Sequence, residues 1–154
     1  GYAVAKGNPK NVNPDDLCGL NVAVETGTVE EDAINKTAKQ CKADGKKDIT
    51  IQSSKQQTDA TTAVVTGKAD VFFADSPVVG YAIAQTEGQL EQLGKDFDSV
   101  PNAIAIKKGD SQTTEAVQKA MQKLMDDGTY TKILQHWGVE SGALDKAEIN
   151  PAVE

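Results

Sequence analysis

The sequence has few of the residues on which several functional classes depend. It contains no arginine, so all 16 basic residues are lysines, and 23 aspartates and glutamates outnumber them. The resulting formal charge of -7 argues against nucleic acids and anionic membrane surfaces as partners, because no basic patch offsets it. No apolar run approaches the roughly 20 residues that a membrane-spanning helix needs.

Cysteine and histidine are also scarce. The sequence has Cys18, Cys41 and a single histidine, His136, with no C-x-x-C pair, so we expect no metal site and no cofactor. Cys18 precedes a predicted strand, and Cys41 lies near the end of the helix predicted after it. A helix packed antiparallel on its strand returns its end to the start of the strand, so the cysteines could form a disulfide. Two buried free thiols are the alternative, whereas a disulfide would indicate an oxidising compartment.

Strand-like and helix-like segments alternate along the chain, and the length favours one domain. We predict strands at residues 2–5, 21–25, 49–51, 69–74, 90–93 and 103–106. We predict helices from residue 29 to about 43 and at 57–66, 75–85, 113–127 and 129–137, with one helical turn at 13–17. In the first helix, Val29, Ala33, Ala38 and Cys41 are predicted to share the buried side. The alternation predicts an α/β fold with a mostly parallel sheet flanked by helices.

Two polar turns follow core strands of the predicted sheet. Thr26–Thr28 follows residues 21–25 and opens a helix, with Thr28 and Glu31 spaced as in a capping box. Asp75 follows the apolar strand at 69–74. Both turns should lie at the carboxyl edge of the sheet, where α/β folds bind ligands. Free N–H groups at a helix start suit a carboxylate and an aspartate suits an ammonium, so the pair matches a zwitterion. A plain helix N-cap is the alternative role for Thr28 and for Asp75.

Several motifs, taken in order, carry a family resemblance. They are LCGLNVAV at 17–24, TGT at 26–28, GKADV at 67–71, ADSP at 74–77 and MDDGTY at 125–130, followed by Ile133-Leu134 and Trp137-Gly138. Together they resemble the polar amino-acid solute-binding proteins of ABC importers. The cysteine placement is similar to that of extracellular lipoprotein members from Gram-positive cells, which supports the disulfide.

The resemblance implies one lobe of a two-lobed, periplasmic-binding-protein-like fold of type II that closes on its ligand. Residues 2–101 would form the second lobe. Residues 102–154 would supply the return strand, the two C-terminal helices and the tail that complete the first lobe. Most of that first lobe would precede Gly1, together with the family's aromatic clamp and the arginine that pairs with the ligand's α-carboxylate.

Ligand contacts also follow from the resemblance. Thr28 would offer its hydroxyl and N–H to the ligand carboxylate, Val29 would offer its backbone N–H, and Asp75 would take the α-ammonium. Glu25 and Glu30 would tune the choice of side chain. The acids at 25, 30, 31 and 32 depart from the family pattern because they add negative charge beside the carboxylate.

The implied function is that of the amino-acid-binding component that delivers a free amino acid to ABC permease subunits. The implied location is extracellular, with a lipoprotein anchor upstream of Gly1, or periplasmic; a cytosolic protein is the alternative if no export signal precedes Gly1. Without the first lobe, the two C-terminal helices would fold back on their own lobe or pair with another copy, with a domain swap as one form of that pairing. A receptor's ligand-sensing domain, a dehydratase on the same fold and an unrelated α/β domain are the alternatives. We expect no enzyme, because no nucleophile–base pair, P-loop, G-x-S-x-G or G-x-G-x-x-G motif is present.

Overall fold

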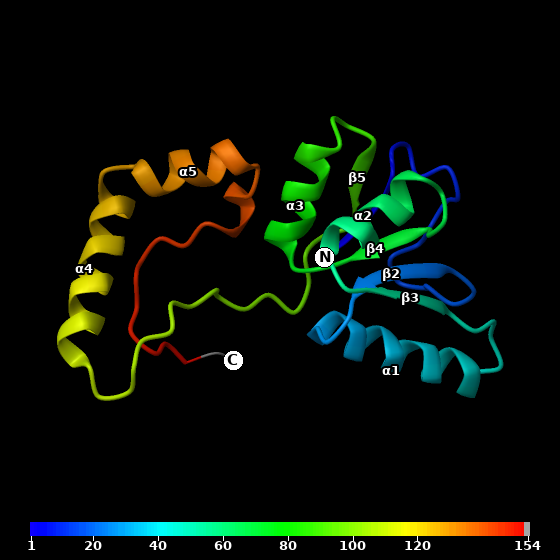
Figure 1. Ribbon diagram of the computed structural model, residues 1–154, viewed down its shortest axis with the longest axis horizontal. Helices are drawn as coiled ribbons and strands as arrows, with labels where there is room; N and C mark the ends of the chain where they lie inside the picture. The colour runs from blue at the N-terminus through cyan, green and yellow to red at the C-terminus, as the bar shows by residue number, and fades with distance from the viewer. Residues whose placement is uncertain (153–154) are drawn as a thin grey trace. The chain divides into compact units, whose positions relative to one another are not determined.

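The computed structural model describes residues 1–152 and divides into two units, Gly1–Phe97 and Asp98–Glu154 (Figure 1). The first unit holds a five-stranded sheet in the order β3-β2-β4-β1-β5. The strands are β1 Tyr2–Ala5, β2 Asn21–Glu25, β3 Thr50–Ser54, β4 Val71–Phe73 and β5 Leu90–Leu93. β2 is parallel to β3 and β4, whereas β1 is antiparallel to β4 and β5. Four strands therefore point the same way, and the predicted α/β fold is confirmed.

Three helices cover the two faces of this sheet. α1 (Val29–Ala43) lies on one face, and α2 (Gln57–Val65) and α3 (Ser76–Gln85) lie on the other (Figure 1). The alternation within β2 explains the division. Val22 and Val24 pack with Ile34 of α1, whereas Ala23 packs in the cluster that contains Ala60 of α2. Among the described residues, none of the helices has both the length and the apolar character needed to cross a membrane.

The predicted buried side of α1 is confirmed for Ala33, Ala38 and Cys41, which pack in or against the core, and is wrong for Val29. Val29 is 74% exposed, and the fully buried residues of the helix are Glu30, Ile34 and Cys41. The disulfide between Cys18 and Cys41, confirmed in the structure with Cα atoms 5.7 Å apart, holds Cys41 on the sheet side. Residues 7 and 11 positions before Cys41 lie on the same side of the helix as Cys41, and these residues are Ile34 and Glu30. Val29 therefore points outward.

Two other local predictions were wrong. Residues 103–106 form no strand and are largely exposed, because no strand of the described chain lies beside them to complete a ladder. Residues 13–17 form a tight turn with a bridge between Asn13 and Asp16 in place of a helical turn. The Asn13 side chain accepts a hydrogen bond from the Asp15 N–H at 3.0 Å, which competes with helix formation.

The second unit contains α4 (Ser111–Asp126), α5 (Thr129–Trp137) and the 3₁₀ turn η1 (Glu140–Gly142). Gly128, in the left-handed conformation at φ 78°, turns the chain between the two α-helices. The following tail is held by α4, because Gln118 donates to the Ala147 carbonyl and Gln122 accepts from the Ala147 N–H. Neither α4 nor α5 contains a buried residue.

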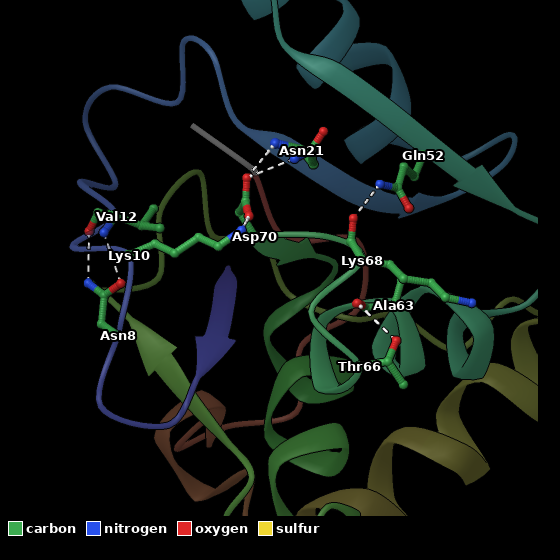
Figure 2. A network of polar contacts seen from close by, with 9 residues as sticks. All are labelled: Asn8, Lys10, Val12, Asn21, Gln52, Ala63, Thr66, Lys68 and Asp70. Carbon is green, nitrogen blue, oxygen red and sulfur yellow. Dashed lines mark hydrogen bonds and ion pairs between the residues drawn. The ribbon is translucent and has the colours of Figure 1, made fainter.

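A polar network fixes the amino ends of β2 and β4 (Figure 2). The Asp70 side chain is 5% exposed and accepts hydrogen bonds from the Asn21 backbone N–H at 2.8 Å and side-chain amide at 3.1 Å, as well as an ion pair from Lys10. Asn8 holds the loop that presents Lys10, bonding both the N–H and the carbonyl of Val12. Burial alone would raise the pKa of Asp70, but the bonds from Asn21 and Lys10 together lower that pKa below its ordinary value.

Candidate functional site

The carboxyl ends of β2, β3 and β4 meet at one edge of the sheet, which we call the carboxyl edge. β1 begins and β5 ends there as well, since Tyr2 pairs with both Phe73 and Leu93. α1, α2 and α3 each start directly after one of the three parallel strands, so their N-termini open onto this edge. The edge therefore gathers free N–H groups and the positive ends of three helix dipoles.

The turn between β2 and α1 is closed by its own side chains. Gly27 has φ +81°, a conformation that favours glycine. The Thr28 hydroxyl accepts from the Glu31 N–H at 3.2 Å and donates to the Glu25 carbonyl at 2.8 Å. The Glu31 carboxylate accepts from the Gly27 N–H at 2.8 Å and from the Ser53 hydroxyl of β3. The Gly27 bond first, and the Ser53 bond second, hold the pKa of Glu31 below its ordinary value.

The predicted capping box is thus present in a shifted form. Thr28 caps the Glu31 N–H as expected, but the Glu31 side chain returns to Gly27 and not to Thr28. The Thr28 hydroxyl already has a donor and an acceptor within the turn. Three backbone N–H groups, those of Thr28, Val29 and Glu30, have no acceptor among residues 1–152. These N–H groups are the donors that the turn can offer to an anion.

Asp75 lies at the start of α3, directly after β4. It occupies the N-cap position, but its carboxylate makes no capping hydrogen bond, and its backbone carbonyl accepts from the Val78 and Val79 N–H groups. The side chain is exposed at the carboxyl edge. A carboxylate that forgoes the usual cap bond is available to a cation from solution.

Glu25 and Glu30 lie on opposite faces of the sheet. Glu25 ends β2, half-buried, on the same face as Ala23, because alternate residues of a strand share a face. Glu30 lies beneath α1 on the other face and is 8% exposed. Neither carboxylate has a hydrogen bond or ion pair to another described residue.

Gly1 lies at the carboxyl edge beside two acids, Asp75 and Asp96. It donates to the Ala74 carbonyl at 2.8 Å, next to Asp75. Asp96, in the loop after β5, lies close to the same position, because a side-chain carbon placed on Gly1 would be 2.9 Å from its Oδ1.

Sequence reasoning missed three features of this edge. Asp96 lies in the loop after β5. Only the end of that short strand indicates that Asp96 lies at the carboxyl edge. Asp96 lines a recess of about 370 Å³ together with Tyr2, Pro14, Asp15, Lys95 and Phe97. The rings of Tyr2 and Phe97 lie 4.9 Å apart there. Gln57 begins α2 at the same edge, and its side-chain Oε1 is buried without a hydrogen-bond partner among the described residues.

The fold and this edge define one lobe of a type II, periplasmic-binding-protein-like α/β protein. The family model of bacterial extracellular solute-binding proteins, family 3, matches residues 15–140, and the chain belongs to that family. No group of three histidine, cysteine, aspartate or glutamate side chains within residues 1–152 is placed to hold a metal ion.

Individual relatives agree with the family. The chain is 39% identical over 150 residues to the arginine-binding protein ArgT of Corynebacterium glutamicum, covering 97% of this chain and 49% of that protein. It is 28% identical over 146 residues to the lysine/arginine/ornithine-binding periplasmic protein of Escherichia coli, covering 86% and 52%. The solved structure of the ancestral amino acid-binding protein AncCDT-1, described as a precursor of cyclohexadienyl dehydratase, aligns with a TM-score of 0.68 at 28% identity, covering 89% and 56%. The chain thus spans about half the length of these relatives.

Proposed function

We propose that this chain is the ligand-gripping lobe and the closing helices of a protein that captures a free amino acid for an ABC importer. One observation carries the proposal. Unassigned N–H groups at the start of α1 and the uncapped carboxylate of Asp75 lie at the same edge of the sheet. The two groups are complementary to the carboxylate and the ammonium of an α-amino acid.

The N–H groups of Thr28, Val29 and Glu30 would hold the ligand carboxylate at the positive end of the α1 dipole. The exposed side chain of Val29 is consistent with a role for its backbone alone. The Thr28 hydroxyl can join only by exchanging its bond to Glu25 for a bond to the ligand. Asp75 would accept the α-ammonium.

The second unit supports a larger, two-lobed protein. We propose that residues 2–101 form the second lobe and that residues 102–154 complete the first, which precedes Gly1 in the whole protein. The strand-like residues 103–106 would then pair with a strand of the first lobe. In the chain alone, the side chains of Ile133 and Trp137 are 48% and 47% exposed, which favours pairing with another copy, for example by a domain swap.

The names of the relatives support binding and transport as the function, with permease subunits as partners and a location outside the cytoplasm. The disulfide is consistent with that location. An anchor as a lipoprotein belongs to the same proposal and rests on the resemblance of the cysteine placement to Gram-positive members.

Catalysis is the less favoured function. One similar binding protein, AncCDT-1, is described as a precursor of the enzyme cyclohexadienyl dehydratase. In this chain, His136 contacts Trp137 in the second unit, with the two ring centroids 5.2 Å apart. A receptor's ligand-sensing domain would share the same edge chemistry, and only the gene's neighbouring segments distinguish it.

Calorimetric titration of the complete protein with a panel of amino acids tests the proposal. Asp75→Ala should lower affinity by about 2–4 kcal/mol, roughly 30-fold to several hundred-fold, because the bound ammonium loses its partner. Asp59→Ala is a matched control, since Asp59 is an exposed acid in the first turn of α2. We expect it to change affinity less than threefold. An Asp75→Ala protein that retains affinity within threefold would refute the assignment.

A further inference from the structure

We propose that Glu31 and Ser53 are positioning residues for the carboxylate of the bound amino acid. They would hold the turn between β2 and α1 in the conformation that presents its free N–H groups. The inference rests on the proposed function, since it assigns a role to two residues beside that site and adds no second site. Neither side chain would contact the ligand. Both would act through the backbone of Gly27.

The turn is built around a residue with a flexible backbone. Gly27 is exposed at φ +81°, and no atom outside the adjacent residues lies within 4 Å of the place where its side-chain carbon would be. Packing therefore does not hold it, and glycine loses more conformational freedom on ordering than any other residue. The N–H groups of Thr28, Val29 and Glu30 follow directly along the chain. Their directions depend on the backbone angles of Gly27, so the order of this one residue decides whether the three donors converge.

A single carboxylate fixes this turn from two sides. Oε2 of Glu31 accepts a hydrogen bond from the Gly27 N–H at 2.8 Å, and Oε1 accepts one from the Ser53 hydroxyl. Ser53 belongs to β3 and pairs in register with Val24 of β2, so the carboxylate joins the turn to the neighbouring strand. α1 lies along both strands (Figure 1), and Glu31 thus connects helix, turn and sheet. We call these two hydrogen bonds the Glu31 latch.

The latch supplies what the other bonds of the turn do not. The Thr28 hydroxyl caps the Glu31 N–H, and the Thr26 N–H donates to the Ser54 carbonyl at 2.8 Å. These bonds fix the residues on either side of Gly27. Within residues 1–152, the acceptor for the Gly27 N–H is the Glu31 carboxylate. Without the latch, binding of an amino acid would have to order Gly27 itself.

The charge of Glu31 makes this role testable. A carboxylate in the first turn of α1 repels the carboxylate of a bound amino acid. The bonds from Gly27 and Ser53 hold the pKa of Glu31 below its ordinary value, so the side chain is ionised at neutral pH. Electrostatics alone therefore predicts that removal of Glu31 strengthens binding, whereas positioning predicts that removal weakens it. The two explanations differ in sign.

Calorimetry on the complete protein, with the twenty common amino acids as probes, distinguishes them. Glu31→Ala should weaken binding of the tightest-binding amino acid about 5- to 30-fold, the cost of ordering one backbone residue on binding. Glu31→Gln keeps an acceptor for the Gly27 N–H and an amide that can bond to Ser53, but it lacks the charge. It should bind that amino acid within threefold of the unmodified protein or more tightly. Ser53→Ala opens one end of the latch and should weaken binding about 2- to 10-fold, the range of one lost hydrogen bond.

Two controls isolate the latch. Asp32→Ala removes the same charge from the next residue of the turn, where the side chain is exposed, and should leave affinity within threefold. The α-carboxamide of the same amino acid lacks the carboxylate charge that strengthens hydrogen bonds from the N–H groups. Glu31→Ala should therefore weaken binding of the carboxamide less than binding of the amino acid.

Unchanged or tighter binding by Glu31→Ala would overturn the inference, since repulsion would then be the main effect of Glu31. A loss in Glu31→Gln as large as in Glu31→Ala would also count against it, because the charge would be responsible. Equal losses for the amino acid and its carboxamide would indicate a general effect on the fold and refute positioning. If Glu31→Ala folds poorly, Ser53→Ala decides, and unchanged affinity there contradicts the latch. These outcomes leave the proposed function standing, whereas an unmodified protein that bound no amino acid would refute the proposed function itself.

Discussion

Replacing Asp70 with alanine should destabilise the first unit without affecting ligand binding. Asp70 joins three segments at the amino ends of β2 and β4, through two bonds from Asn21 and one ion pair from Lys10 (Figure 2). The substitution leaves the Asn21 backbone N–H without its acceptor, which costs about 1–3 kcal/mol. The Asn21 side-chain amide loses a further bond of about 1 kcal/mol.

Lys10 contributes less to this network than Asp70. Its side chain is 54% exposed, so the freed ammonium can return to water, and an exposed ion pair is worth about 0–1 kcal/mol. The total for Asp70→Ala is therefore about 2–4 kcal/mol in the free energy of unfolding. Lys10→Met, which leaves the two Asn21 bonds in place, should cost about 1 kcal/mol or less.

Urea denaturation followed by circular dichroism measures both variants, and calorimetry measures their affinity for the amino acid. Both should bind it within threefold of the unmodified protein, because the network lies at the end of β2 and β4 remote from the carboxyl edge. An Asp70→Ala variant no less stable than Lys10→Met would refute the assignment of the main effect to Asn21.

Acidification should remove the contribution of Asp70. Its pKa in the folded protein lies below the ordinary value of 3.8, so the carboxylate stabilises the fold fully above that value. The contribution is lost as the pH falls below 3.8 and through the folded-state pKa. The difference in unfolding free energy between the unmodified protein and Asp70→Ala should be constant near neutral pH and shrink in that acidic range. A difference that grows on acidification would contradict this sign.

Two further predictions concern the disulfide and the second unit. Alkylation of the unreduced, denatured protein should label no thiol, and reduction should expose Cys18 and Cys41; without the link, the chain-entropy model predicts a loss of about 3 kcal/mol in unfolding free energy. Two labelled thiols before reduction would disprove the link. The 154-residue chain alone should self-associate in multi-angle light scattering, whereas the complete two-lobed protein should be a monomer; a monomeric chain with Trp137 fully solvated would count against the pairing.

The sheet and its helices could be predicted because each strand carries its own apolar pattern. Residues 22–24 and 71–73 are wholly apolar and buried on both sides of the sheet, so both strands are evident from the sequence. The segment at 103–106 shows the limit of such patterns. A strand needs a neighbour for its backbone hydrogen bonds, and no local pattern reports whether that neighbour is present.

The candidate site was predictable only in part, for a similar reason. Thr28 and Asp75 follow strands directly, so the sheet rule places them at one edge. The burial of Glu30 was not predictable from hydrophobic spacing, which assigns charged residues to the outside. Asp96 lies far from Glu30 and Asp75 in sequence, and only the antiparallel pairing of β1 with β5 brings it to Gly1. Its role could not be read from any local motif.

The positions of the acidic side chains in the first turn of α1 explain how an anion could bind beside them. An acid at this position stabilises the helix through the dipole, but a free carboxylate beside the N–H groups would repel the ligand carboxylate. In the structure, the acids can stabilise the helix through its dipole while their carboxylates are held away from the free N–H groups. Glu31 is turned back onto Gly27 and Ser53, and the Glu30 side chain lies beneath the helix, on the side that faces the sheet. The N–H groups of Val29 and Glu30 remain without acceptors in the described chain, so the turn keeps its donors while its acids stabilise the start of the helix.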